Sequence, residues 1–211
     1  MKIRAIITGA TGMVGEGVLH ECLLHQEVEK VLVINRKPCG VSHPKLKEII
    51  HADFFDISPL ERQLAGYNAC YFCAGVSSAG MNEKKYRHLT YDLTLSFATT
   101  LVKVNPDMTF IYVSGSGTDS SEKGRMMWAR IKGKTENDIF KLGFKNAYAF
   151  RPGFMQPTTG LKNTLKGYAL VSWFFPVLRF AFPGYACTLE EVGNAMIYAT
   201  LKGYKQQVLE V

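Results

Sequence analysis

The chain has 211 residues, a formal net charge of +7 and an isoelectric point near 9.1. Its length suits one domain, which we place at residues 1–211, and leaves no room for a separate second domain. The basic residues are scattered, and aromatic residues do not interleave with them, so we expect no nucleic acid partner. An anionic cofactor and a small anionic substrate explain the positive charge equally well.

Strands and helices are expected to alternate along the first three quarters of the chain. Apolar runs predict strands at residues 2–7, 30–34, 46–51, 69–74, 108–113 and 146–150. Helical patterns predict helices at residues 14–24, from 58 onward, 82–104 and 121–142. Ser58 is expected to cap the second helix, with Pro59 as its first residue. This alternation predicts an α/β fold, a doubly wound parallel sheet in the order 3-2-1-4-5-6.

The last part of the chain, about residues 155–211, is less regular and is expected to form a small helical part on the substrate side. Residues 165–182 are strongly apolar but are interrupted by Pro176 and Arg179. They are too short to span a bilayer of about 30 Å. We expect a helix that covers the substrate, with a membrane-surface or homo-oligomer contact as the alternative. Thr188 and Glu191 predict a capping box that starts a final helix.

The most specific motif is a glycine turn that joins the first strand to the first helix. Its glycines are Gly9, Gly12 and Gly15, in the segment Thr8–Gly15. The spacing requires a tight turn, a backbone that a pyrophosphate can approach, and close packing of helix on strand. The free N–H groups of the helix N-terminus would bind the phosphates. We therefore expect a dinucleotide site that includes Gly9, Thr11, Gly12, Met13, Val14 and Gly15.

This segment resembles the cofactor fingerprint of the extended and atypical short-chain dehydrogenase/reductases, which bind NAD(P). The resemblance implies that Asp53 lies near the adenine amino group, with Phe54 beside the same ring. It also implies that Ala74, Gly75 and Val76 let the cofactor ribose approach the backbone. Arg151 and Pro152 resemble the turn that lines the nicotinamide end in this family.

Arg36 and Lys37 stand at the end of the second strand, where the adenosine ribose would lie. An acidic residue there would bind the 2′-hydroxyl of NAD, whereas two cations favour a 2′-phosphate. NADP(H) is therefore the expected cofactor, with NAD(H) as the alternative. A solvated arginine without a ligand is the other interpretation of Arg36.

The catalytic motif of the resembled family is incomplete in this chain. Family members carry a serine or threonine after the fifth strand and a Tyr-x-x-x-Lys on the next helix, and the candidates for the hydroxyl here are Ser114 and Ser116. Lys132 matches the lysine, but Trp128 stands where the tyrosine is expected. An indole N–H only donates and cannot exchange a proton at useful pH. We expect Trp128 to close the nicotinamide pocket beside Ser114 and Lys132.

A second Tyr-x-x-x-Lys, at Tyr198 and Lys202, falls on the final helix and is interpreted as coincidence. The five cysteines, an odd number, indicate reduced thiols, and a cytoplasmic location is expected. Cys70 and Cys73 would point to opposite faces of a strand, so neither a redox motif nor a metal site is expected there.

Three functions are consistent with these features. The first is an NADPH-dependent oxidoreductase in which Ser114, Lys132, water or the substrate replaces the missing phenol. The second is a non-catalytic dinucleotide-binding redox sensor that acts through a partner. A nucleotide-sugar epimerase or dehydratase is favoured least, because the substrate domain and the proton-transferring tyrosine are lacking.

Overall fold

A seven-stranded parallel sheet forms the centre of the protein in the computed structural model, which describes residues 2–164, 174–181 and 184–211. The strand order is β3-β2-β1-β4-β5-β6-β9, so the order predicted for the first six strands is confirmed and β9 extends the sheet beside β6. The strands are β1 (Ile3–Thr8), β2 (Val28–Asn35), β3 (Leu46–Ile50), β4 (Ala69–Phe72), β5 (Thr109–Val113), β6 (Asn146–Arg151) and β9 (Val208–Glu210).

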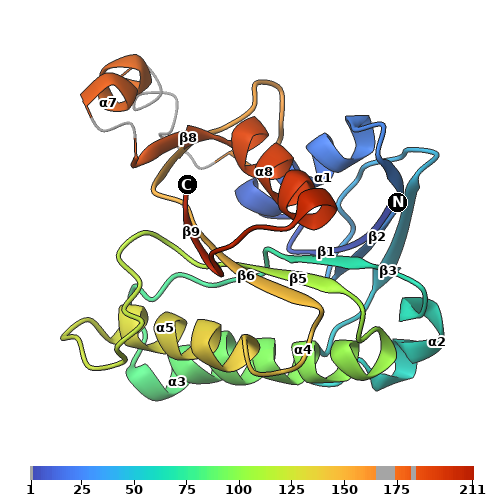
Figure 1. The fold of residues 1–211 in the computed structure, drawn as a ribbon, viewed down its shortest axis with the longest axis horizontal. Helices are drawn as coiled ribbons and strands as arrows, with labels where there is room; N and C mark the ends of the chain where they lie inside the picture. Colours follow the sequence, from blue (N-terminus) through green and yellow to red (C-terminus); the bar gives the residue numbers. More distant parts are fainter. Residues whose placement is uncertain (1, 165–173, 182–183) are drawn as a thin grey trace.

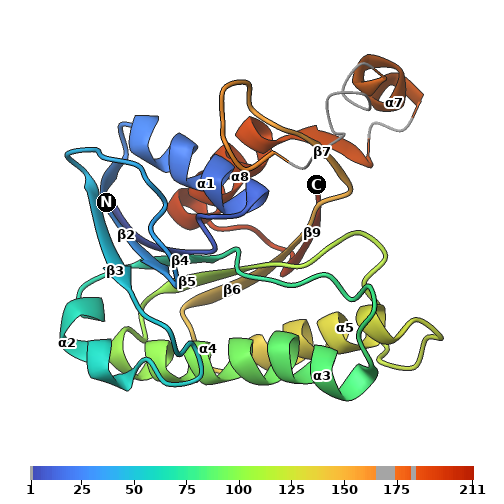
Figure 2. The same cartoon turned by 180° about the vertical axis from the view of Figure 1, so that it is seen from behind.

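Helices cover both faces of this sheet, as Figures 1 and 2 show. On one face lie α1 (Met13–Leu24) and α8 (Leu189–Lys202). On the other lie α2 (Glu61–Leu64), α3 (Glu83–Arg87), α4 (Leu93–Val104) and α5 (Met127–Ile139). The predicted capping box starts α8: Glu191 N donates to Thr188 Oγ1 over 3.0 Å, and Thr188 N donates to Glu191 Oε2 over 2.8 Å.

The core has two halves because successive strand residues point to opposite faces. Along β1, Ile3, Ala5 and Ile7 pack toward α1 and α8, whereas Ile6 packs toward α4. The cysteines follow the same rule: Cys70 lies in the α4 half and Cys73 packs against the α1 half. All five cysteines are free thiols, and the separation of this pair confirms the prediction from the sequence.

Two predicted helices differ in detail from the structure. Ser58 does not cap a helix but lies inside a short 3-10 turn, η1 (Ser58–Leu60), that precedes α2. The helix expected from residue 121 begins only at Met127, because the Asp119 carboxylate accepts hydrogen bonds from Ser121 N and Gly124 N and holds that segment as a loop. Local side-chain bonds of this kind compete with helix formation.

The predicted long helix over residues 82–104 is present but is not uniform. Asn82 caps it, with Lys85 N donating to its side-chain oxygen over 2.9 Å. Between α3 and α4 the chain makes one π-helical turn, η2 (His88–Asp92). Turns of this type occur often at functional sites.

The helix expected to cover the substrate lies largely outside the described residues, which omit 165–173 and 182–183. Its described part, α7 (Phe175–Ala181), packs on a small two-stranded sheet of β7 (Phe154–Gln156) and β8 (Ala186–Thr188). Phe175 contacts Phe154 there, with ring centroids 6.1 Å apart. Figure 1 shows α7 away from the main sheet, so this part does not pack on it as expected. No helix among the described residues is long and apolar enough to cross a membrane.

Candidate functional site

The glycine turn after β1 has the close contacts that its sequence predicts. Gly9 has a φ of +73°, and a Cβ atom at Gly15 would lie 2.2 Å from the Gly9 carbonyl oxygen. A side chain at Gly15 would therefore force β1 and α1 apart. Gly12 differs, because a Cβ there would meet only Gly9 O, at 3.5 Å. The fold therefore requires Gly15, whereas it leaves the space beside Gly12 open.

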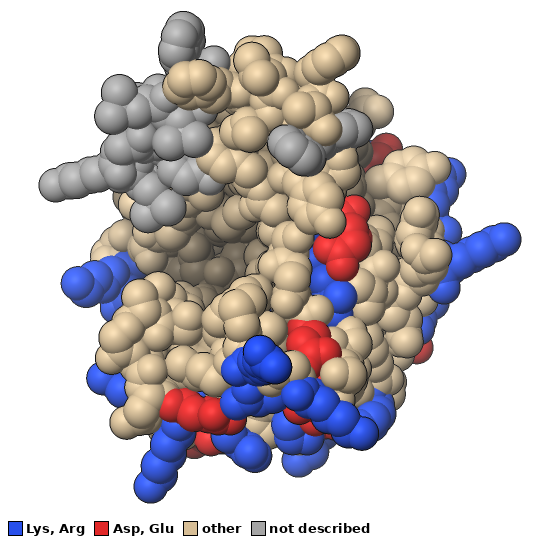
Figure 3. Space-filling view, turned by 90° about the vertical axis from the view of Figure 1, so that its left-hand side faces the viewer, with Lys and Arg blue, Asp and Glu red and all other residues tan. Residues whose placement is uncertain are grey.

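That open side of the turn faces a large cavity at the carboxyl ends of the strands. The cavity has a volume of about 610 Å³, within the range of small-molecule sites. Figure 3 shows the hollowed surface on this side of the molecule, with a largely uncharged wall. Ten residues predicted to contact a dinucleotide line it: Gly9, Thr11, Gly12, Arg36, Lys37, Asp53, Phe54, Ala74, Gly75 and Val76. The structure thus brings together segments that are distant in the sequence.

The predicted Met13, Val14 and Gly15 do not line this cavity. They form the first turn of α1, with Gly12 as its N-cap and no side-chain hydrogen bond to the cap. The free backbone N–H groups of such a helix N-terminus are suited to bind an anion. A pyrophosphate beside Gly12 therefore fits both the open space and the charge of this helix end.

A buried polar link, which the sequence analysis missed, holds the glycine turn to β2 and β3. Asn35 is 2% exposed, and its Oδ1 accepts from Ala10 N over 3.2 Å while its Nδ2 donates to Glu48 Oε1 over 3.1 Å. Cys39 N donates to the same carboxylate oxygen over 2.9 Å. Glu48 thereby fixes both ends of the short loop that carries Arg36 and Lys37. The only signal in the sequence was a polar residue at the end of an otherwise apolar strand.

Lys132 lies at a smaller cavity of about 160 Å³ that shares Cys73, Ala74, Gly75 and Val76 with the large one. Its Nζ donates to the Ser114 carbonyl oxygen over 2.8 Å. Burial lowers the pKa of Lys132 to about 8, although the nearby Glu136 carboxylate acts in the opposite direction. Ser114 also lines this cavity, and its hydroxyl lies 2.9 Å from that of Thr118. The predicted pairing of Ser114 with Lys132 therefore exists, through the serine backbone.

Trp128 is placed differently from the prediction. It is half-buried on α5, four residues before Lys132, and its ring lies beside Gly117. The lining of neither cavity includes Trp128, so it does not close the pocket beside Lys132. Ser116 also lines neither cavity, and its backbone N–H donates to the Pro152 carbonyl oxygen over 3.0 Å. Ser116 and Pro152 thus join the loops after β5 and β6.

Arg151 is a structural residue and not the cofactor contact that was predicted. Its guanidinium donates to both carboxylate oxygens of Glu136, to Glu210 Oε1 over 3.2 Å and to Ser120 Oγ. Glu136 is fully buried and Arg151 is 8% exposed. These bonds join α5 and β9 to β6 and leave little of the guanidinium for a ligand. A charged pair that is removed from water requires such complete partnering.

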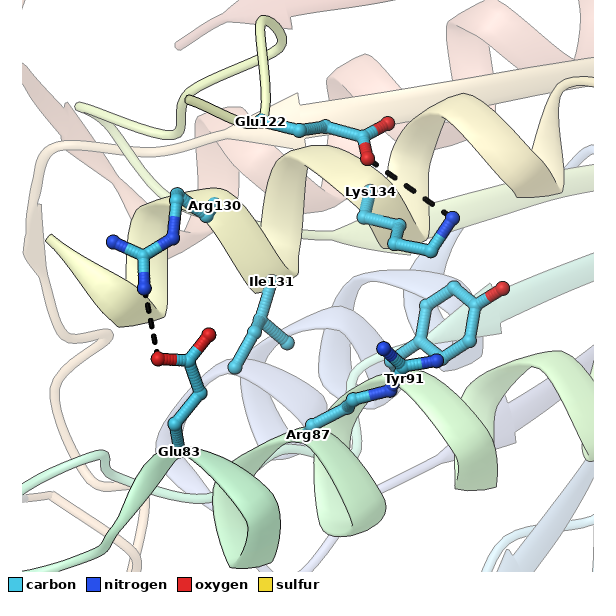
Figure 4. Close-up of a pocket in the computed structure, with 7 residues that line it drawn as sticks. All are labelled: Glu83, Arg87, Tyr91, Glu122, Arg130, Ile131 and Lys134. Carbon is cyan, nitrogen blue, oxygen red and sulfur yellow. Dashed lines mark hydrogen bonds and ion pairs between the residues drawn. The ribbon is translucent and has the colours of Figure 1, made fainter. Parts of the chain in front are cut away.

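A third cavity, of about 120 Å³, lies between α3 and α5 (Figure 4). Two of its cations are paired: Arg130 Nη2 lies 2.8 Å from Glu83, and Lys134 Nζ lies 2.8 Å from Asp138 and 4.0 Å from Glu122. Arg87 and Lys134 both approach the ring of Tyr91. We assign this cavity to helix packing, because most of its charged side chains already bind partners within the protein.

The fold and the glycine-lined cleft define a dinucleotide-binding protein of the Rossmann type. Residues 5–124 match the NAD dependent epimerase/dehydratase family, and the chain belongs to this family. This membership confirms the resemblance to extended short-chain dehydrogenase/reductases. NAD(P) binding is thereby established as the general property of the chain.

Relatives over nearly the whole chain come from fungi. The chain is 28% identical to "Protein FMP52, mitochondrial" of Meyerozyma guilliermondii, which covers 99% of this chain and 90% of the relative. It is 28% identical to the protein of the same name from Candida glabrata, over 95% of this chain and 86% of the relative. The expected cytoplasmic location is wrong in light of these names, since four relatives at 25–28% identity are named as mitochondrial.

Solved structures share the fold at low sequence identity. A UDP-N-acetylglucosamine 4-epimerase from Methanobrevibacter ruminantium M1 superimposes with a TM-score of 0.70 at 16% identity, over 100% of this chain and 77% of that one. The Bordetella bronchiseptica enzyme WbmG, solved in complex with NAD, gives a TM-score of 0.72 at 11% identity, over 100% and 73%. At these identities the similarity establishes the doubly wound fold.

The different surroundings of Gly12 and Gly15 lead to opposite expectations for their substitution. Gly12→Val should fold and yet lose at least about tenfold in dinucleotide affinity, because the branched side chain occupies the phosphate position. Gly15→Ala should destabilise the fold itself, because its Cβ meets backbone. Thermal unfolding and fluorescence titration with NADPH measure the two effects. Gly184→Ala, with no atom within 4 Å of the new Cβ, is the control. A Gly12→Val variant with parental affinity contradicts the assignment.

The environment of Arg151 predicts a loss of stability upon its replacement. Arg151→Met should lower the free energy of unfolding by about 3–5 kcal/mol, because it leaves the buried Glu136 carboxylate unpaired. The double variant with Glu136→Leu should recover part of this loss. Urea unfolding measures both, and NADPH affinity of the folded variants should stay near the parental value. A stable Arg151→Met protein with weakened NADPH binding would instead support the prediction that Arg151 contacts the cofactor.

Proposed function

We propose that the protein is an NADPH-dependent reductase that acts on a carbonyl group. The observation that carries the choice of cofactor is the placement of Arg36 and Lys37, both exposed, in the wall of the large cavity. They lie at the end of β2, where the 2′-position of the adenosine ribose is bound in this fold. Charge-assisted bonds from Arg36 to a phosphate favour NADPH over NADH.

The residues of the cleft fit a dinucleotide along its whole length. Gly12 and the N-terminus of α1 would hold the pyrophosphate, and Asp53 with Phe54 would lie at the adenine. Ala74, Gly75 and Val76 form the wall between the two cavities and would meet the nicotinamide half. When bound, NADPH supplies a hydride to an electrophilic carbon. That Ser114 and Lys132 line the cavity on the other side of this wall supports a role for them in the proposed reaction.

Lys132 is the residue that is best placed to release and take up a proton near the nicotinamide half of the cofactor. Its ammonium is held by the Ser114 carbonyl oxygen, and its lowered pKa lets it release a proton near neutral pH. Tyr86, Thr90, Thr94, Tyr112 and Ser114 are buried side chains of this cavity, and a site with little water strengthens hydrogen bonds to a developing alkoxide. Lys132 thus positions the cofactor ribose and supplies protons to the site.

A second candidate function is a non-catalytic dinucleotide-binding redox sensor. It is favoured by Trp128, which replaces the proton-transferring tyrosine on α5. Binding of NADPH without turnover of any carbonyl compound is the result that would favour the sensor over the reductase.

Arg36→Ala should narrow the preference for NADPH over NADH. The expected loss of NADPH affinity is about tenfold, which corresponds to about 1.4 kcal/mol, and NADH affinity should change little. Calorimetric titration with each cofactor measures the ratio. Arg125→Ala removes the same charge from an exposed position outside the cavity lining and serves as the control. Equal affinity of the parent protein for both cofactors contradicts the proposal.

Lys132 should titrate well below an ordinary lysine in the cofactor-free protein. Acetylation by acetic anhydride requires the neutral amine, so its rate at Lys132 should rise through pH 8 and level off above it. An ordinary lysine reacts with a midpoint near pH 10.4. Mass spectrometry of peptides labelled at several pH values measures both. A midpoint above about pH 10 at Lys132 would contradict the buried position of its ammonium.

A further inference from the structure

The small cavity contains a phenol that the sequence motif did not indicate. Tyr86, on α3, lines the cavity together with Ser114 and Lys132 and is 2% exposed. It comes from a helix other than α5, which carries Trp128 and Lys132. The cavity therefore has the hydroxyl type that the replaced tyrosine would have supplied, from a different direction.

The surroundings of Tyr86 connect it to the cavity. Its hydroxyl meets Thr90, one turn further along, in the π-helical segment η2. Thr90 also lines the cavity, is 5% exposed, and its Oγ1 has no hydrogen-bond partner among the described residues. A buried hydroxyl without a fixed partner is uncommon and calls for an explanation. A transient proton path through Thr90 would explain why its hydroxyl has no fixed partner.

The second phenol of the cavity, Tyr112, is less suited to this task. It lies on β5 in the core half that faces α4, and its hydroxyl is engaged by Thr135 of α5. Tyr86 lies close to Thr90 and also to Tyr112 itself. Of the two phenols, Tyr86 is the one with a hydroxyl partner that itself lines the cavity.

We propose that Tyr86 is the proton donor of the reductase, in place of the tyrosine that Trp128 replaces. The proposal rests on the proposed reductase function. As hydride from NADPH reaches the carbonyl carbon, the π electron pair of the C=O bond moves to oxygen. The O–H bond of Tyr86 then breaks and its proton passes to that oxygen, which gives the alcohol. Lys132 returns a proton to the phenolate, through Thr90 or a bridging water, and is itself reprotonated by solvent.

The electrostatics of the cavity agree with this order of transfers. Burial raises the pKa of Tyr86, so the phenol stays protonated at neutral pH and remains available as a donor. Burial lowers the pKa of Lys132, so its ammonium gives up a proton more readily than an exposed one. A cavity of about 160 Å³ has room for water between the two groups.

The test compares Tyr86→Phe with Tyr67→Phe, a control that removes another buried phenol, one that lies outside both cavity linings. The probes are NADPH with 9,10-phenanthrenequinone and with 4-nitrobenzaldehyde. We expect Tyr86→Phe to lower kcat about 100-fold or more with little change in KM or NADPH affinity. Tyr67→Phe should stay within about twofold of the parent.

A binding measurement supplements the kinetics. Isobutyramide carries a carbonyl oxygen that accepts a hydrogen bond but is not reduced, and its binding to the NADPH complex is followed by fluorescence. Tyr86→Phe should weaken this binding about tenfold. If Tyr86→Phe does not fold, Thr90→Val has the same shape as the parent side chain and should lower kcat about tenfold.

The outcomes separate the two proposals. Turnover by the parent together with unchanged kcat and isobutyramide binding in Tyr86→Phe would overturn the role of Tyr86 and leave the reductase intact. A parent that binds NADPH but reduces neither probe would overturn both the reductase and the proton donor.

Discussion

The close approach of Gly15 to the Gly9 carbonyl is the constraint on which the rest of the site depends. Because no Cβ separates them, α1 starts directly against the end of β1, and its free N–H groups open into the cleft. Asn35 fixes the same turn from β2 through Ala10 N, and Glu48 connects Asn35 to β3. The phosphate-binding backbone is therefore held from two neighbouring strands before any ligand is present, which lowers the entropic cost of binding.

One helix, α5, combines a structural and a chemical task. Glu136 pairs with Arg151 and so anchors α5 to β6, while Lys132, one turn earlier, projects toward the carbonyl oxygen of Ser114. The ion pair costs desolvation energy and is not a source of stability in itself. The ion pair instead fixes the position of α5, the helix that carries Lys132. A small shift of α5 would remove Lys132 from the cavity and change its pKa.

The chain belongs to the NAD dependent epimerase/dehydratase family, and the reductase proposed here needs both a dinucleotide and a proton-transfer group. Ten of the residues expected to contact a dinucleotide line one cavity in the described part of the chain. The proton-transfer half differs, since α5 presents Trp128 in place of the tyrosine. The structure offers phenols from α3 and β5 instead, around the same lysine. The segment after β4 supplies more of the lining of this small cavity than any other, with Cys73, Ala74, Gly75 and Val76, whereas α3, η2 and the loop after β5 supply one residue each.

The sequence by itself determined the parts of this protein that depend on local chemistry. Strand alternation, the order of six strands, the glycine turn and the capping box of α8 each follow from spacing within a few residues or from general rules of chain connection. The cofactor residues at the carboxyl ends of the strands could also be foreseen, because parallel strands bring those ends to one edge.

Only the tertiary structure decided the features that depend on partners far along the chain. Arg151 follows a strand in the expected manner, yet Glu136 and Glu210 determine what its guanidinium binds. The strand β9 has three residues and exists because β6 offers it a free edge. Tyr86 and Lys132 are 46 residues apart, and nothing in their spacing indicates a shared cavity. Burial and pairing of polar groups are properties of the folded surroundings, so they appear only once the helices have packed on the sheet.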